Sequence, residues 1–111
     1  MDREILRLRW PIFADEFSEV NQGRPLSIEI VGDTLGDQEM AEATPFVALD
    51  YDDRTEAAIL ISVVTGEEVF THTILNPEEL WVHDDPDGTA LALQVVASDG
   101  QKTILRFEDS S

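Results

Sequence analysis

The chain has 111 residues, of which 24 are Asp or Glu and only 7 are Lys or Arg, so its formal net charge is −17. Its length predicts one domain, and a hydrophobic content of 42% distinguishes it from an acidic disordered segment. The absence of cysteine excludes disulfides, thiolate catalysis and Cys-ligated zinc, and the negative charge disfavours direct binding to nucleic acid or an anionic membrane.

The excess of acidic residues also indicates the solvent to which the protein is adapted. Repulsion between exposed carboxylates is screened over about 10 Å in 0.1 M salt but over about 3 Å in molar salt, a dependence that halophiles use. We therefore expect salt adaptation, with an ordinary acidic bacterial protein as the alternative. The chain has neither a signal-peptide pattern nor an apolar run of membrane length, which predicts a cytoplasmic domain.

The first predicted element is a helix over residues 10–22. Pro11 is favourable in a first helical turn, whereas Gly23 and Pro25 end the pattern. Apolar residues recur at spacings of three, four and three, at Trp10, Phe13, Phe17 and Val20. This is the period of one helical face, and we expect that face to pack against a sheet.

The rest of the chain, residues 26–107, has the alternation of β-strands separated by turn residues. The predicted strands cover residues 26–31, 46–49, 57–64, 69–75, 80–82, 91–96 and 103–107. Residues 32–44 are polar and suggest an irregular connection with a helical turn at 38–43. Asp99-Gly100 is the strongest hairpin signal, and residues 108–111 are expected to fray.

These elements predict a single α+β domain over residues 1–111. Strands joined by such short turns must be antiparallel, and their natural twist curls the sheet. We therefore expect an N-terminal helix packed on a curled antiparallel β-meander of six to seven strands. The expected shape is a half-barrel with the helix over one opening.

Short motifs over nearly the whole chain are similar to those of one bacterial family. They are Arg9-Trp10-x-x-Phe13 with Phe17-Ser18 and Gly23, Gly36-x-Gln38, Pro45-Phe46, Leu49-Asp50-Tyr51-Asp52, His72-x-Ile74-x-x-Pro77, Asp99-Gly100 and Leu105-Arg106-Phe107. Together they resemble the domain-of-unknown-function family numbered 5335. The resemblance implies a small stand-alone bacterial domain without an assigned activity, and it supplies no catalytic residue.

Two acidic turns are the candidate ligand sites. If the segments Asp50–Asp53 and Asp84–Asp87 met at one end of the barrel, their carboxylates could hold Mg²⁺ or Ca²⁺ weakly. The candidate ligands are Asp50, Asp52, Asp84 and Asp85. The alternative is that both segments are solvated turns, because chance clusters are expected when acids are this abundant.

A calcium-loop reading of Asp85-x-Asp87-Gly88 fails on its spacing. With Gly88 at the sixth position of the twelve-residue loop, His83 and Gln94 occupy the first and last positions, where carboxylates are required. A hairpin turn is therefore predicted. The other histidine, His72, would share a strand face with Phe70 and Ile74, which indicates a hydrogen-bonded core or edge residue.

The sequence contains neither a Gly-x-Ser-x-Gly nucleophile motif nor a glycine loop with the lysine of a phosphate site. We therefore predict a non-enzymatic domain without a cofactor, whose partner is another protein bound through a sheet edge or a basic complementary surface. The alternative function is a divalent-cation or small-ligand site at the two acidic turns. Acids gathered on one face would suggest mimicry of nucleic-acid charge, whereas even coverage would indicate solvation.

Overall fold

The computed structural model describes residues 1–32, 36–54 and 56–108. Within these ranges it has one α-helix, one 3₁₀ helix and eight strands. They are β1 (Asp2–Glu4), η1 (Arg7–Arg9), α1 (Trp10–Asn21), β2 (Pro25–Gly32), β3 (Gly36–Asp52), β4 (Ala58–Thr65), β5 (Glu68–Leu75), β6 (Pro77–Asp84), β7 (Ala90–Ala97) and β8 (Lys102–Phe107). The predicted α+β class is confirmed, and β1 adds a strand that the sequence pattern did not indicate.

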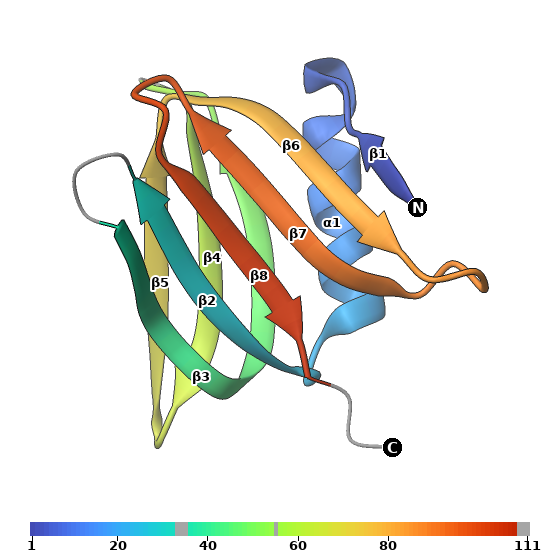
Figure 1. Cartoon of the computed structure of the whole chain (residues 1–111), viewed down its shortest axis with the longest axis vertical. Coiled ribbons are helices and arrows are strands. Elements are labelled where there is room, and N and C mark those ends of the chain that lie inside the picture. Colours follow the sequence, from blue (N-terminus) through green and yellow to red (C-terminus); the bar gives the residue numbers. More distant parts are fainter. Residues whose placement is uncertain (33–35, 55, 109–111) are drawn as a thin grey trace.

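The strands form one antiparallel sheet in the order β1-β6-β7-β8-β2-β3-β4-β5. The sheet curls into two layers, with β6, β7, β8 and β2 in front of β4 and β5 in Figure 1. The 17-residue strand β3 joins the layers, because its first part pairs with β2 and its second part with β4. The predicted curled sheet is confirmed, and β1 and β5 are its two edges.

The connection from β5 to β6 departs from a simple meander. These two strands are separated by Asn76 alone, which has a positive φ of 52°, and they do not pair with each other. The Asn76 N–H donates to the Ala57 carbonyl, and its carbonyl accepts from Ser98, both at 2.9 Å. The chain therefore passes from one layer to the other at this residue, and β8 completes the order by pairing with β2.

The prediction of an irregular segment with a helical turn at residues 38–43 is wrong. These residues belong to β3, which pairs with β2 from Pro25 opposite Pro45 to Gly32 opposite Gly36. A ladder is made by backbone groups, so the polar composition of this segment did not prevent it from pairing.

The C-terminal tail begins beside the first residue of β2, where the Glu108 N–H donates to the Pro25 carbonyl at 2.8 Å. The rest of the predicted tail, residues 109–111, lies outside the described ranges.

Helix α1 packs alongside the second part of β3. Its buried residues are Trp10, Ala14, Phe17 and Asn21, which recur every three or four positions as one helical face. The ring of Phe17 lies 5.6 Å from that of Phe46, and Trp10 meets Tyr51 edge-on at 5.3 Å. Val20, predicted on this face, is instead 77% exposed, because the buried position of the last turn belongs to Asn21.

The core lies between the two layers and under α1. Its fully buried side chains alternate along the strands as the sequence pattern predicts; they include Leu26, Ile28, Leu49, Ile61, Val63, Leu80, Val82, Leu93, Val95 and Leu105. In the described part of the chain, every buried side-chain polar atom has a hydrogen-bond partner. No helix among these residues is long and apolar enough to cross a membrane.

Candidate functional site

The segment Asp84–Asp87 begins at the last residue of β6 and continues into the turn between β6 and β7. The Asp85 carboxylate accepts hydrogen bonds from the backbone N–H groups of Asp87 and Thr89, both at 3.0 Å. A side-chain hydrogen bond with Asp85 and further bonds from Thr89 lower the pKa of Asp87. Gly88 has the positive φ, 92°, that such a turn requires. Since these carboxylates bind their own backbone, the loop has the structure of the predicted hairpin turn.

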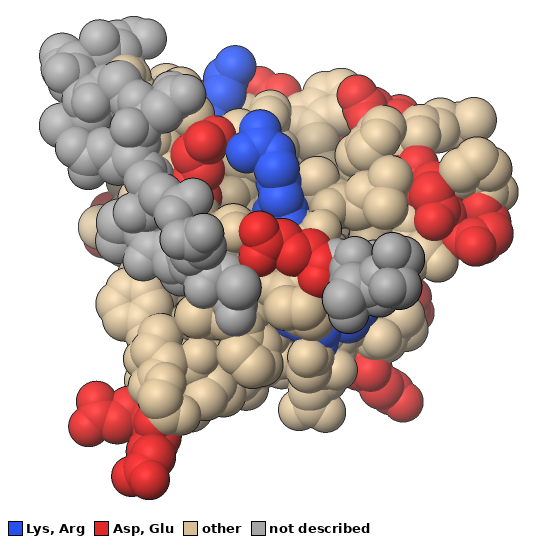
Figure 2. Space-filling model, turned by 60° about the horizontal axis from the view of Figure 1, so that its bottom comes forward, with Lys and Arg blue, Asp and Glu red and all other residues tan. Residues whose placement is uncertain are grey.

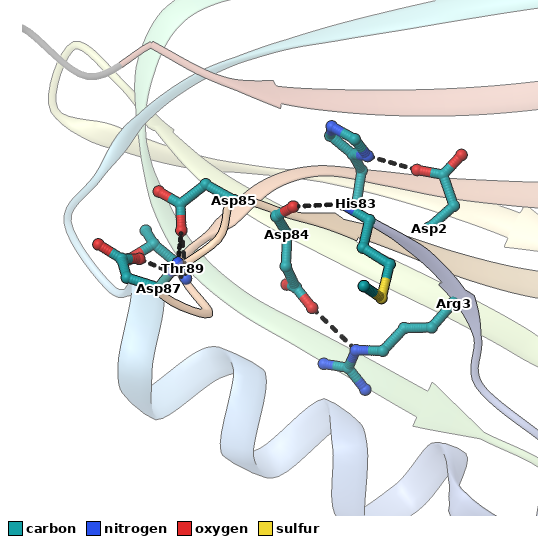
Figure 3. Close-up of polar contacts among 8 residues, drawn as sticks. Asp2, Arg3, His83, Asp84, Asp85, Asp87 and Thr89 are labelled. Carbon is teal, nitrogen blue, oxygen red and sulfur yellow. Dashed lines mark hydrogen bonds and ion pairs between the residues drawn. The ribbon is translucent and has the colours of Figure 1, made fainter.

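Asp84 points away from this turn, as Figure 3 shows. Its carboxylate accepts a 2.8 Å hydrogen bond from Arg3 Nε on β1. His83, the residue before Asp84 on β6, pairs with Asp2 of β1. Asp84 therefore helps to attach β1 to β6, while Asp85 shapes the loop, and the two carboxylates serve different partners.

The segment Asp50–Asp53 covers the last three residues of β3 and the first residue after it. Asp52 is engaged by Arg54, whose Nε and Nη2 atoms contact its two carboxylate oxygens at 3.1 and 3.0 Å. The side-chain hydrogen bonds from Arg54, with a further one from its backbone N–H, lower the pKa of Asp52 to about 2. This carboxylate already has a cation, although the pair is exposed to solvent.

The structure does not bring the two acidic segments together. Asn76, just before β6, contacts Glu56 and Ala57 near the Asp50–Asp53 turn, whereas Asp84 is the last residue of β6. The eight residues of this strand span roughly 25 Å. Among the described residues no group of three or more His, Asp or Glu side chains could hold a metal ion. The described residues therefore do not form the joint site that was considered as the alternative.

His72 lies on the edge strand β5, opposite Ile61 of β4. Its side chain is partly buried, and the burial lowers its pKa. Within the described residues it makes no side-chain hydrogen bond, so its environment is more apolar than we expected. Among the residues that the structure describes, no acid or hydroxyl group is bonded to it as a partner of a catalytic base would be.

The feature that sequence analysis identified least clearly is the free edge at β5. The β4–β5 turn has two residues, because Thr65 pairs with Glu68. In such a hairpin the flanking pair exchanges hydrogen bonds, and alternate pairs do so along the ladder. The backbone groups of Val69, Thr71, Thr73 and Leu75 therefore point away from β4. No described residue binds them.

The β5 edge also carries exposed apolar side chains. Val69 is 61% exposed, Leu75 is 55% exposed and Phe70 is 37% exposed. Natural sheets protect such edges with lysine, proline or a bulge. The sequence of β5 contains neither residue type, and its register with β4 runs without a shift. An extended, unprotected edge of eight residues is thus available for pairing.

The acids do not form one continuous block on the face that Figure 2 shows. Asp and Glu side chains lie there in several separate places, with Lys and Arg side chains among them. This distribution differs from the ordered stripe that would imitate a nucleic-acid backbone.

Comparison with known proteins agrees with the motifs spread over the chain. The model of a family described as a family of unknown function, DUF5335, matches residues 1–111. The chain belongs to this family. An uncharacterised protein of Aquifex aeolicus is a relative of this DUF5335 protein, 26% identical over 106 residues that cover 96% of the chain and 91% of the relative. No solved structure matches the chain.

Proposed function

We propose that this DUF5335 protein is a non-catalytic interaction domain whose β5 edge takes up an extended segment of a partner protein as an added strand. The observation that carries the proposal is the row of outward-facing backbone groups at Val69, Thr71, Thr73 and Leu75. Strand addition obtains its affinity from such backbone hydrogen bonds and its specificity from alternate side chains. The exposed Val69 and Leu75 side chains offer the apolar contacts.

The charges around this edge favour a basic partner. Glu67 and Glu68 lie at the N-terminal end of β5. At its C-terminal end, Glu56 accepts a hydrogen bond from Asn76, the residue after β5. A strand carrying Lys or Arg beside apolar residues would complement this edge. A second copy of the chain is a poorer fit, since it brings another charge of −17 to the interface.

The acidic surface itself is proposed to keep the domain soluble and folded in a salt-rich cytoplasm. High salt screens the repulsion between exposed acids. It also weakens the steering of a basic partner, so the apolar and backbone contacts at β5 would supply most of the affinity there. This division of roles explains why the edge is apolar on an otherwise acidic protein.

The proposal is tested by substituting proline at a β5 residue whose backbone N–H points away from β4. Thr73→Pro removes one outward donor, and an edge strand tolerates proline there because the ladder to β4 does not use that N–H. Thr73→Ala removes the same side chain and keeps the donor. The probe is an eight-residue peptide of alternating lysine and valine, with an alternating glutamate and valine peptide as the charge control.

Binding is followed by amide hydrogen exchange of the whole protein. We expect the lysine peptide to protect the amides of Val69, Thr71, Thr73 and Leu75 in the native protein and in T73A. In T73P we expect affinity to fall at least fivefold. If the peptide protects amides elsewhere, or if T73P and T73A bind it equally, strand addition at β5 is refuted.

A further inference from the structure

We propose that the groove between α1 and the β1–β6 pair is a second binding site, which takes a short extended peptide with an apolar centre between a basic and an acidic side chain. The groove has a volume of about 440 Å³, within the range of ligand sites. It is independent of the proposed strand addition, since β1 and β5 are opposite edges of the sheet.

The floor and the lips of the groove are apolar. Phe17, Val82 and Ala90 are buried at its floor. Leu6, which precedes η1, and Val20 on α1 also line it, yet they are 66% and 77% exposed. Large apolar side chains on both lips of one groove would be covered by a ligand with an apolar centre.

The groove is lined by charged side chains of both signs. Arg9 lies at the start of α1, and Glu16 lies seven residues further along the same helix. Seven residues amount to about two turns and roughly 10 Å of rise. Asp84, at the end of β6, and Glu4, at the end of β1, also line the groove.

These charges differ in whether a neighbour already neutralises them. Arg3 lines the groove but is paired with Asp84. The side chains of Arg9 and Glu16, and that of Glu4, make no hydrogen bond or ion pair within the described part of the chain. Of these three, Arg9 and Glu16 lie on the same helical face, seven residues apart. A peptide could place an acid beside Arg9 and a base beside Glu16, and so satisfy both.

The spacing of the two charges sets the length of the peptide. In an extended chain, residues i and i+4 lie on one face and about 13 Å apart. That distance suits Arg9 and Glu16 once the reach of their side chains is included. Residue i+2 lies on the same face and would meet Phe13, which is half-buried in the groove wall.

The probes are three pentapeptides with blocked ends, titrated into the full chain and followed by chemical shifts. They are acetyl-Lys-Val-Leu-Val-Glu-amide, a version with lysine at both ends and a version with glutamate at both ends. We expect the Lys/Glu peptide to shift the resonances of Phe13, Val20 and Ala90 and to bind at least fivefold more tightly than the two others.

Charge substitutions decide whether the groove selects these ends. The R9E variant (Arg9→Glu) should bind the peptide with two lysines at least fivefold more tightly than the Lys/Glu peptide. The E16K variant (Glu16→Lys) should instead bind the peptide with two glutamates most tightly. Arg54→Glu makes the same change in net charge as R9E, but Arg54 is bound to Asp52 at the β3–β4 turn. R54E should leave the order of affinities unchanged.

Three results would overturn this inference. They are weak, equal binding of all three peptides, an equal change of preference in R9E and R54E, and shifts confined to β5 instead of the groove. The last result would still support strand addition, whereas shifts in the groove with an unprotected β5 edge would reject strand addition alone. The two proposals are therefore separable with the same protein.

Discussion

The backbone N–H of Leu49 donates a 2.7 Å hydrogen bond to the hydroxyl of Ser18, and this bond joins α1 to β3. Leu49 lies opposite Ile61 of β4. In an antiparallel ladder only alternate residue pairs exchange hydrogen bonds, and Leu49–Ile61 is a pair that does not. The backbone groups of Leu49 therefore point away from β4. The regular pairing of β2 with β3 ends at Pro45. Helix α1 therefore takes the place of β2 along the second part of β3, and one serine provides a polar contact there.

Ser18→Ala is expected to destabilise the protein by about 1–3 kcal/mol, because it leaves a partly buried backbone donor without its partner. The Leu49 carbonyl, 3.0 Å from the hydroxyl, loses a contact as well. The free energy of unfolding in urea measures the effect. Ser27→Ala is the control, since Ser27 on β2 makes no side-chain hydrogen bond within the described chain. Equal stability of the two variants would show that the Ser18 bond contributes nothing.

Arg24→Lys is expected to reduce stability by about 1–2 kcal/mol, because lysine cannot reproduce a planar group that stacks and bonds at once. Arg24 Nη1 donates to Asn21 Oδ1 at 2.7 Å and to the Ala90 carbonyl at 2.9 Å. Its guanidinium also lies 4.1 Å from the centre of the Phe107 ring. It thus connects the end of α1 to β7 and β8.

Arg54→Lys provides the comparison for this substitution in the same denaturation experiment. Arg54 pairs with Asp52 in solvent, with 86% of its side chain exposed, and exposed pairs contribute little. We expect almost no change for R54K. A loss of stability as large as that of R24K would mean that a general effect of losing arginine, not the Arg24 contacts, is being measured.

His72 is expected to make the protein less stable as the pH falls. Burial lowers its folded-state pKa below the model-peptide value of 6.5, so the unfolded chain binds a proton more readily. The neutral form supports the fold fully above pH 6.5, and this contribution is lost as the pH falls from 6.5 towards the folded-state pKa. Unfolding free energies between pH 7.5 and 5.5 measure the loss.

The matched variants are His72→Leu and His83→Leu, since these are the two histidines of the chain. H72L should flatten the pH dependence over this interval, while H83L should leave the contribution of His72 in place. Comparing slopes removes the background from the many carboxylates. The prediction fails if H72L keeps the slope of the unmodified protein.

The unfolding midpoint is expected to rise with KCl concentration. At about 10 Å two like charges in water repel by roughly 0.4 kcal/mol before screening, and a net charge of −17 contains many such pairs. Molar KCl removes most of this repulsion. A midpoint that falls or stays constant between 0.1 and 2 M KCl would contradict the salt adaptation that we propose.

Ca²⁺ or Mg²⁺ added in molar KCl is expected to produce no further stabilisation. The two acidic turns are too far apart to share an ion, and binding to the native state alone would raise the midpoint by mass action. Thermal unfolding with sub-millimolar divalent ion, and again after EDTA, provides the measurement. A rise that EDTA reverses would establish a cation site that the described geometry does not suggest.

Local patterns predicted most of the secondary structure. The spacing of Trp10, Phe13 and Phe17 indicated α1, and alternation indicated β2 and the strands from β4 onward. These predictions succeed because a helical or extended backbone places side chains with its own period. The same reasoning failed for residues 38–43, where the backbone pairs without an apolar pattern, and for Val20, whose place in the core is taken by Asn21.

The candidate site depended on contacts that no local pattern contains. The sequence showed acids at Asp50–Asp53 and Asp84–Asp87, but the direction of β6 decided that they lie apart. It also gave no sign that β5 would end the sheet or that Ser18 would bind Leu49. By itself the sequence determined the charge, the helix, most strands and the fold class, since these follow from composition and neighbouring residues. Only the tertiary structure decided the strand order, the free edge and the groove, because these depend on which distant segments pair.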